Sequence, residues 1–189
     1  MKTDARVRYT RMRIQEAFYD CLAHKPVSRI TVKELCEAAE INRATFYKHY
    51  ADPFDLLQKQ EEEMLAQLQE QLDQRDGLDM AQLMATIWGD AGRNGQSRYA
   101  LLSSPNGDPA FLTRISELFY RRFRPSMGRS LTGRTQDEQT AAYLFLAGGC
   151  GNLLSRWTEH GQTAPIEQVI ATIDEMCEAF VSAYGKSGD

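Results

Sequence analysis

The amino-acid sequence predicts an all-α protein of about nine helices. Three observations favour this class: apolar residues recur at three- and four-residue spacing, strand-like alternation is almost absent, and capping residues and prolines punctuate the pattern. With 189 residues, 42% of them hydrophobic, the chain has enough apolar material to bury a core. We expect a three-helix amino-terminal domain over residues 1–52 and a larger helical domain over residues 53–189.

A proline and a capping box bound the first two helices. Apolar residues share one face over residues 10–24, and Pro26 ends that helix. Thr31 and Glu34 form the capping box T-x-x-E, in which each side chain satisfies a free backbone donor. The second helix is therefore expected over residues 32–39.

Two further N-caps follow closely. Asn42 precedes a third helix over residues 43–50. Asp52, followed by Pro53, opens a fourth helix that runs without a breaker to residue 74. At about 1.5 Å per residue, this helix is long enough to join two domains.

The rest of the chain continues the helical pattern. S-P-N-G-D-P is a turn, Pro125 ends a helix, and residues 127–135 form a loop. We expect the later helices over residues 79–88, 96–102, 110–124, 136–160 and 165–184.

The net charge of -4 conceals an uneven distribution. Residues 1–50 hold ten Lys and Arg against six Asp and Glu, whereas residues 51–189 hold twelve against twenty. A basic head on an acidic body suits a protein that presents one end to a polyanion. Because no apolar run reaches the length of a membrane span and no signal peptide is recognisable, we expect a cytoplasmic protein.

The third helix separates into two faces. Phe46 and Tyr50 lie on the side expected to pack against the first two helices, and Ala44 and Lys48 lie opposite. A short helix, a tight turn and such a polar second helix make a helix-turn-helix, whose second helix enters the DNA major groove. The predicted DNA-binding residues are Thr31, Lys33, Arg43, Ala44, Thr45, Tyr47, Lys48 and His49. For any one cation, a plain solvated helix is the alternative.

These residues carry a family resemblance. The stretch ITVKELCEAAEINRATFYKHYADPFDLL resembles the DNA-binding signature of the TetR family of bacterial regulators. SPNGDPAF and LSRWTEHG are similar to segments of a subgroup related to dihydroxyacetone-kinase regulators. The resemblance implies a homodimer with a DNA-binding domain and a ligand-binding, dimerising body. It places base contacts at Arg43, Ala44 and Lys48, and phosphate contacts at Thr45 and Tyr47.

The chain departs from the family pattern at two positions. Glu40 stands in the turn where many relatives have glycine, which costs up to about 1 kcal/mol if the backbone is left-handed there. Pro53 stands where relatives commonly have a phosphate-binding lysine. That second contact is therefore not expected here.

The helix over residues 136–160 contains three glycines, each of which costs roughly 1 kcal/mol relative to alanine. Because glycine lets another helix approach closely, we expect a two-fold, four-helix dimer interface. Its predicted residues are Gly148, Gly149, Gly151, Ile166, Ile170, Ile173, Cys177 and Phe180. A phosphate-binding glycine loop is the rival interpretation, but neither G-x-G-x-x-G nor Walker spacing is present.

Apolar residues of the body are candidates for an effector pocket, although such stripes are also typical of an ordinary core. The candidates are Met64, Leu68, Met84, Trp88, Phe119, Phe123 and Tyr143. The basic residues 121–124 either neutralise an anionic ligand or complement the dipole of their helix.

The sequence indicates neither a metal site nor a catalytic site. Its four cysteines lack zinc-ligand spacing and are expected to be buried free thiols, and no cofactor is expected. There is no GxSxG or HExxH, so we do not expect an enzyme.

We expect a sequence-specific DNA-binding transcriptional regulator, acting as a ligand-responsive dimeric repressor on double-stranded operator DNA. One alternative is a helical protein-interaction adaptor, which explains the fold but not the charge distribution. Another is a regulator of the same kind that acts as an activator or without a small-molecule ligand.

Overall fold

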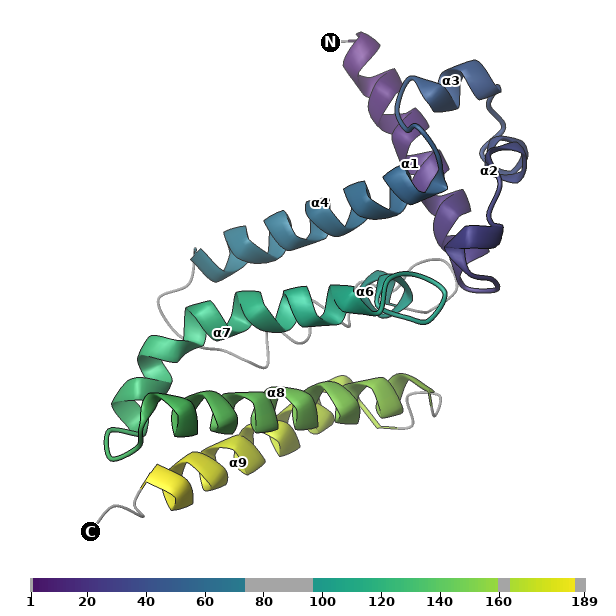
Figure 1. The fold of residues 1–189 in the computed structure, drawn as a ribbon. Helices are drawn as coiled ribbons and strands as arrows, with labels where there is room; N and C mark the ends of the chain where they lie inside the picture. The colour runs from purple at the N-terminus through teal and green to yellow at the C-terminus, as the bar shows by residue number, and fades with distance from the viewer. Residues whose placement is uncertain (1, 74–96, 160–163, 186–189) are drawn as a thin grey trace. The chain divides into compact units, whose positions relative to one another are not determined.

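The computed structural model describes residues 2–73, 97–159 and 164–185 (Figure 1). Every element formed by these residues is helical, as the sequence predicts. The elements are α1 (Lys2–Leu22), the 3-10 helix η1 (Val27–Arg29), α2 (Val32–Ala38), α3 (Arg43–Tyr47), α4 (Pro53–Asp73), α6 (Arg98–Leu102), α7 (Ala110–Ser130), α8 (Gln136–Glu159) and α9 (Ile166–Gly185). The helix expected over residues 79–88 lies outside the described residues.

The chain divides into two compact units. The first comprises Met1–Glu70 with Asp90–Leu112, and the second comprises Gln71–Gly89 with Thr113–Asp189. The functional boundary expected between residues 52 and 53 stays a prediction. Each unit is described by itself below.

Fully buried side chains from three helices form the core of the first unit. Ile14 and Phe18 of α1, Leu35 of α2 and Phe46 of α3 all have 0% of their surface exposed. The ring of Tyr50 is also buried, and its centroid lies 5.8 Å from that of Phe46. Burying each such side chain stabilises the fold by roughly 1.5–3 kcal/mol relative to leaving it in water.

Helix α1 begins at Lys2, well before the expected start at residue 10. Residues 5–9 are exposed, so this part of the helix has no buried face and therefore no apolar periodicity in its sequence. Alanine and arginine have high helix propensities, which favour a solvated helical extension. The extension carries Arg6 and Arg8 on exposed turns.

The predicted caps of α2 and α4 are confirmed. Thr31 Oγ1 accepts from the Glu34 N–H at 3.3 Å, and Glu34 Oε1 accepts from the Thr31 N–H at 3.1 Å. At the start of α4, Asp52 Oδ1 accepts from the N–H groups of Phe54 and Asp55 at 2.8 and 2.9 Å. These bonds satisfy donors that have no partner within their own helix.

The turn between α2 and α3 contains a left-handed residue that is not glycine. Glu40 has a φ of 52°. Its N–H donates to the Glu37 carbonyl at 3.2 Å, and the Ile41 N–H donates to the Cys36 carbonyl at 3.0 Å. This pair of bonds is a Schellman motif, in which glycine is the usual left-handed residue. Arg13 of α1 donates to the Glu40 carboxylate at 3.0 Å.

The turn after α6 closes on the carboxyl end of α1. Asn106 Nδ2 donates to the Leu22 carbonyl at 2.9 Å, although the two residues are 84 positions apart. The Asn106 carbonyl accepts from the Val27 N–H at 2.7 Å. A Cβ atom at Gly107 would collide with the Leu102 carbonyl, so this turn requires glycine.

In the second unit, α7 continues to Ser130, and the expectation that Pro125 ends it is wrong. Proline removes one hydrogen bond and crowds the carbonyl four residues earlier, which kinks a helix without necessarily ending it. Figure 1 shows α7 bending toward its carboxyl end. The loop expected over residues 127–135 is reduced accordingly to residues 131–135.

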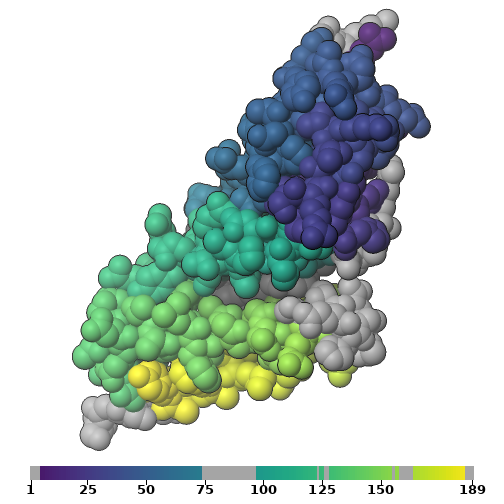
Figure 2. Space-filling model, turned by 45° about the vertical axis from the view of Figure 1, so that its right-hand side comes forward, coloured from purple at the N-terminus to yellow at the C-terminus, as the bar shows by residue number. Residues whose placement is uncertain are grey.

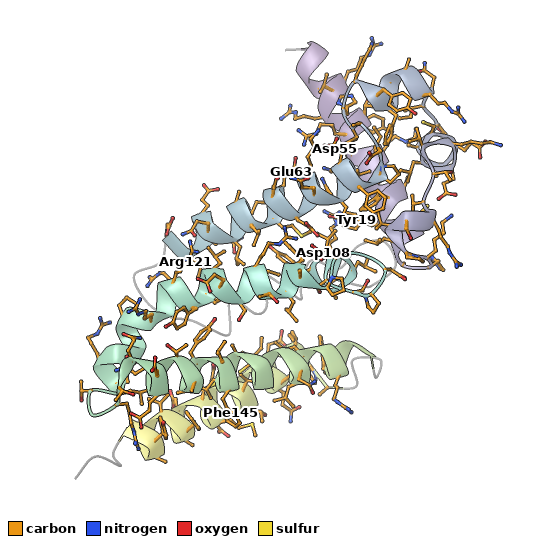
Figure 3. All side chains as sticks on the ribbon, in the orientation of Figure 1. Tyr19, Asp55, Glu63, Asp108, Arg121 and Phe145 are labelled. Carbon is orange, nitrogen blue, oxygen red and sulfur yellow. The ribbon has the colours of Figure 1, made fainter. Side chains whose placement is uncertain are left out.

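Helices α8 and α9 lie side by side and antiparallel (Figures 1 and 2). Phe145 of α8 stacks on Phe180 of α9 with ring centroids 5.4 Å apart (Figure 3). The Trp157 indole donates to the Ala164 carbonyl at 2.8 Å, which joins the end of one helix to the start of the other. No helix within the described ranges is both long enough and apolar enough to cross a membrane.

We predict that Glu40→Gly stabilises the protein by about 0.5–1 kcal/mol, because glycine adopts a left-handed backbone without the steric penalty of a Cβ atom. The matched control is Glu40→Ala, which removes the carboxylate held by Arg13 but keeps the Cβ atom. Denaturant unfolding of both variants measures the difference. A glycine variant no more stable than the alanine variant contradicts a strained turn.

Candidate nucleic-acid interface

Asn42 fixes the start of α3. Its Oδ1 accepts from the Thr45 N–H at 2.7 Å and from the Thr45 hydroxyl at 2.9 Å. Helix α3 ends at Tyr47 rather than at the expected residue 50, because the chain turns there and places Tyr50 in the core. The helix is therefore short, and its cap and its buried residue determine its orientation.

The two faces of α3 differ sharply in exposure. Phe46 is 0% exposed on the inner side, whereas Tyr47 is 57% exposed. Arg43, Ala44 and Lys48 are also exposed. The structure thus gathers two cations, one phenol and one small residue on a single outward surface, which we call the α3 face.

The cations of the first unit fall into two groups. Several are neutralised by carboxylates: ion pairs join Arg11 to Glu63, Arg13 to Glu40, and Lys25 to Glu34. Arg43 and Lys48 of the α3 face form no ion pair within the part of the chain that the structure describes. Their charges therefore remain available for a polyanion.

Two predicted DNA-binding residues already use their hydroxyls within the protein. Thr31 Oγ1 accepts the capping bond of α2, and the single proton of the Thr45 hydroxyl goes to Asn42. Thr45 must give up or share that bond to donate to a phosphate, whereas Thr31 accepts its capping bond and keeps its own hydroxyl proton for a phosphate oxygen. Lys33 is exposed and lies 3.8 Å from Glu37, a surface pair of the kind that contributes little to stability.

His49 lies at the edge of the α3 face and is half-buried. Burial lowers its pKa, and the nearby cations Arg11 and Lys48 lower it further. Its imidazole is therefore mainly neutral at pH 7. The backbone carbonyl of His49 accepts a hydrogen bond from Lys59 Nζ of α4 at 3.2 Å.

Lys59 is a positioning residue that the sequence analysis did not identify. Besides the His49 carbonyl, its ammonium group contacts the Asp55 carboxylate at 2.8 Å and lies 5.4 Å from the centre of the Tyr50 ring. The hydrogen bond from Lys59 and that from the Ala51 N–H lower the pKa of Asp55. The spacing of Asp55 and Lys59, four residues apart on a helix, was the available signal.

The expected pocket residues lie in different parts of the structure. Met64 and Leu68 are buried in the first unit, and Phe119 and Tyr143 are buried in the second. Met84, Trp88 and the side chain of Phe123 lie outside the described residues. The Tyr143 hydroxyl donates to the Ser116 carbonyl at 2.6 Å, and burial raises its pKa to about 12.

The expected dimer residues also divide by exposure. Gly148 and Gly149 are exposed on α8, and a Cβ atom at either position would meet nothing within 4 Å. Gly151, Ile166, Cys177 and Phe180 are half-buried. Ile170 and Ile173 are already buried within the single chain, so they have little surface left to offer a second copy.

Comparisons with known proteins agree with a helix-turn-helix protein. No protein-family model matches the chain. The uncharacterized HTH-type transcriptional regulator YxbF of Bacillus subtilis (strain 168) is 46% identical over 56 residues, which are 29% of this chain. The match covers 15% of that relative, so the chain spans only a small part of its length.

A solved structure resembles nearly the whole chain. It is the fatty acid degradation regulator FadR from Bacillus halodurans, with a TM-score of 0.62 over 89% of this chain and 94% of that one. The sequences are 12% identical, so the likeness concerns the fold alone. The chain shares the all-helical fold of this regulator.

We predict that Asn42→Ala destabilises the protein by about 1 kcal/mol, because α3 loses its N-cap. Asn42→Ser is the control, since serine is a comparably good cap and should lose much less. Thermal unfolding followed by circular dichroism measures both. Equal losses in the two variants would show that the cap does not stabilise α3.

Proposed function

We propose that this protein is a sequence-specific DNA-binding transcriptional regulator of the TetR family, acting as a ligand-responsive dimeric repressor. The proposal rests on the α3 face. This cationic surface belongs to a short helix that the buried Phe46 anchors in the core, and α2 and a tight turn precede that helix in the chain. The local similarity to an HTH-type transcriptional regulator supports it. A protein-interaction adaptor does not account for the two cations of the α3 face, which form no ion pair among the residues that the structure describes.

In this proposal α3 is the recognition helix and enters the major groove. Arg43 and Lys48 donate to base edges, where their charge and reach suit guanine O6 and N7. Ala44 is exposed between them and small enough for the helix to approach the bases closely. The Tyr47 hydroxyl donates to a phosphate oxygen, which sets the position of the helix without reading sequence.

The second unit would supply the dimer. An exposed apolar stripe runs along α8, in which Leu144 and Phe145 are 60% and 68% exposed beside the open surface of Gly148 and Gly149. Monomeric proteins rarely expose such a contiguous patch. A second copy packed on this stripe would bury it. To engage successive major grooves, the two recognition helices of such a dimer must lie about 34 Å apart, one turn of DNA.

An effector then regulates the dimer by linkage. A small molecule lowers operator affinity if it binds more tightly to a form of the dimer whose recognition helices have another spacing. By linkage, the bound operator weakens the binding of that molecule by the same factor. A coupling of about 1–3 kcal/mol would release the operator roughly 5- to 150-fold. Sequencing the DNA fragments that the purified protein selects identifies the operator needed for such titrations.

We predict that Lys48→Ala weakens operator binding by about 1–3 kcal/mol and relaxes preference at one base pair, because a base contact is lost. Tyr47→Phe should weaken all DNA sequences alike, because a phosphate contact is lost.

Fluorescence anisotropy with the selected operator and its single-base variants measures both effects. Arg121→Ala is the control for charge, because Arg121 is an exposed cation of the second unit. Full operator affinity in a Lys48→Ala, Tyr47→Phe double variant would remove the recognition-helix assignment.

We predict that Gly149→Leu converts the dimer to monomers. A Cβ atom at this position meets nothing within 4 Å among the described residues, and leucine favours the helix by roughly 0.8 kcal/mol, so the protomer itself should stay folded. The added side chain instead holds a second chain away. Analytical ultracentrifugation gives the mass, and Thr132→Leu controls for an added exposed leucine outside the stripe. A stable dimer of Gly149→Leu moves the interface to another surface.

A further inference from the structure

Two cysteines from different helices of the second unit face each other. Cys150 of α8 and Cys177 of α9 are 27 positions apart, and their Sγ atoms lie 3.7 Å apart. Both are free thiols and half-buried rather than fully buried, which corrects the expectation that all four cysteines are buried. Only Cys36 meets that description, and Cys21 is also half-buried.

The geometry is close to that of a disulfide. The bonded sulfurs of a disulfide are about 2.05 Å apart, so the thiols need to approach by roughly 1.7 Å to form one. A metal is a poorer occupant, because the described residues contain no group of three or more His, Cys, Asp or Glu that could hold one. The pair is therefore better suited to redox chemistry.

We propose that Cys150 and Cys177 form a two-cysteine oxidation site that reacts with hydrogen peroxide and closes an intrachain disulfide between α8 and α9. The proposal does not depend on DNA binding. The relevant observation is the meeting of two thiols from neighbouring helices, with both residues half-buried rather than fully buried.

The electrostatics distinguish the two sulfurs. The hydrogen bond between the two thiols lowers the pKa of Cys177 to about 7. The same contact, together with burial, raises the pKa of Cys150. The charge of Asp174 raises the pKa of both thiols, but at Cys177 the hydrogen bond between the thiols has the larger effect. These directions make Cys177 the thiol that ionises more readily and Cys150 the thiol that keeps its proton.

These states assign the two steps of the reaction. The Cys177 thiolate attacks one peroxide oxygen, the O–O bond breaks, and the departing hydroxide takes a proton to become water. The product is a sulfenic acid on Cys177. The Cys150 sulfur then attacks the Cys177 sulfur, the S–O bond breaks, and the Cys150 proton leaves with the hydroxide as a second water. Overall, two thiols and one peroxide give one disulfide and two waters.

The site faces away from the proposed dimer surface. At about 100° per residue, Cys150 lies on the side of α8 opposite the exposed stripe of Leu144 and Gly148. A second copy packed on that stripe would not come between the sulfurs of Cys150 and Cys177. Oxidation therefore joins two helices of one chain rather than two chains.

The test uses the full chain, reduced and then treated with a small excess of hydrogen peroxide. We expect two of the four thiols to disappear and peptide mapping to give one disulfide-linked peptide pair containing Cys150 and Cys177. Cys21 and Cys36 serve as internal controls, because burial raises the pKa of each thiol. Four retained thiols, equal oxidation of the control cysteines, or a disulfide between chains each overturn the proposal.

Single variants separate the two roles. In Cys150→Ser, or in Cys150→Ala if the first is unstable, Cys177 should stop at the sulfenic acid and be labelled by dimedone. In Cys177→Ser, Cys150 should react more slowly than Cys177 does in the wild-type chain, because burial still raises the pKa of Cys150 after its thiol partner is removed. Dimedone labelling of Cys150 instead of Cys177 contradicts the assignment.

The rate for the wild-type chain should rise with pH and level off at a lower pH than the rate of an ordinary thiol, because the contact with Cys150 lowers the pKa of Cys177. An ordinary thiol, with a pKa near 8.5, keeps accelerating above pH 8. A rate that continues to rise through pH 9 excludes an activated Cys177.

Discussion

The burial of the Phe46 ring beneath α3 determines which side chains of that helix face solvent. A helix of five residues has no independent stability, because forming the first turn fixes several residues for a single hydrogen bond. Phe46 supplies the missing free energy because its side chain lies in the core of the first unit with 0% of its surface exposed. With one side fixed in this way, the helical period directs Arg43, Ala44, Tyr47 and Lys48 outward. The Asn42 cap and the left-handed Glu40 then set where α3 begins relative to α2.

The second unit follows a different constraint. Most of α8 is apolar on every side, but the chain itself covers only part of it: Tyr143 and Leu154 are buried, and Leu144 and Phe145 are not. The glycines lie on the open side, where the chain provides no neighbour that would require them. Their conformational cost is unexplained by a single copy and is offset if another helix approaches at that point. The cysteine pair occupies the opposite side, between α8 and α9.

How much the sequence predicts depends on whether a feature is local. The capping box at Thr31, the N-caps at Asn42 and Asp52, and the inward side of α3 are all short-range patterns, and each is confirmed. The early start of α1 and the passage of α7 through Pro125 were missed because solvated or kinked turns leave no apolar periodicity.

Contacts distant in sequence were not predictable from spacing. The meeting of Cys150 with Cys177 depends on the register of two helices. The hydrogen bond from the Thr45 hydroxyl to Asn42 is local in sequence. It was nevertheless not predicted, because only the geometry shows that the hydroxyl donates its proton to Asn42.

The turn around Asn106 bears on the order in which the chain can acquire its structure. The last carbonyl of α1 and the first amide of η1 both bond to Asn106, far along the chain. On a ribosome adding about 5–20 residues per second, these groups wait several seconds for their partner to emerge. Until then the Leu22 carbonyl and the Val27 N–H are left to solvent. The first unit therefore completes its structure only after much of the following chain has been made. A fragment that ends with α4 would contain every residue of the α3 face but would lack Asn106, which bonds to the end of α1.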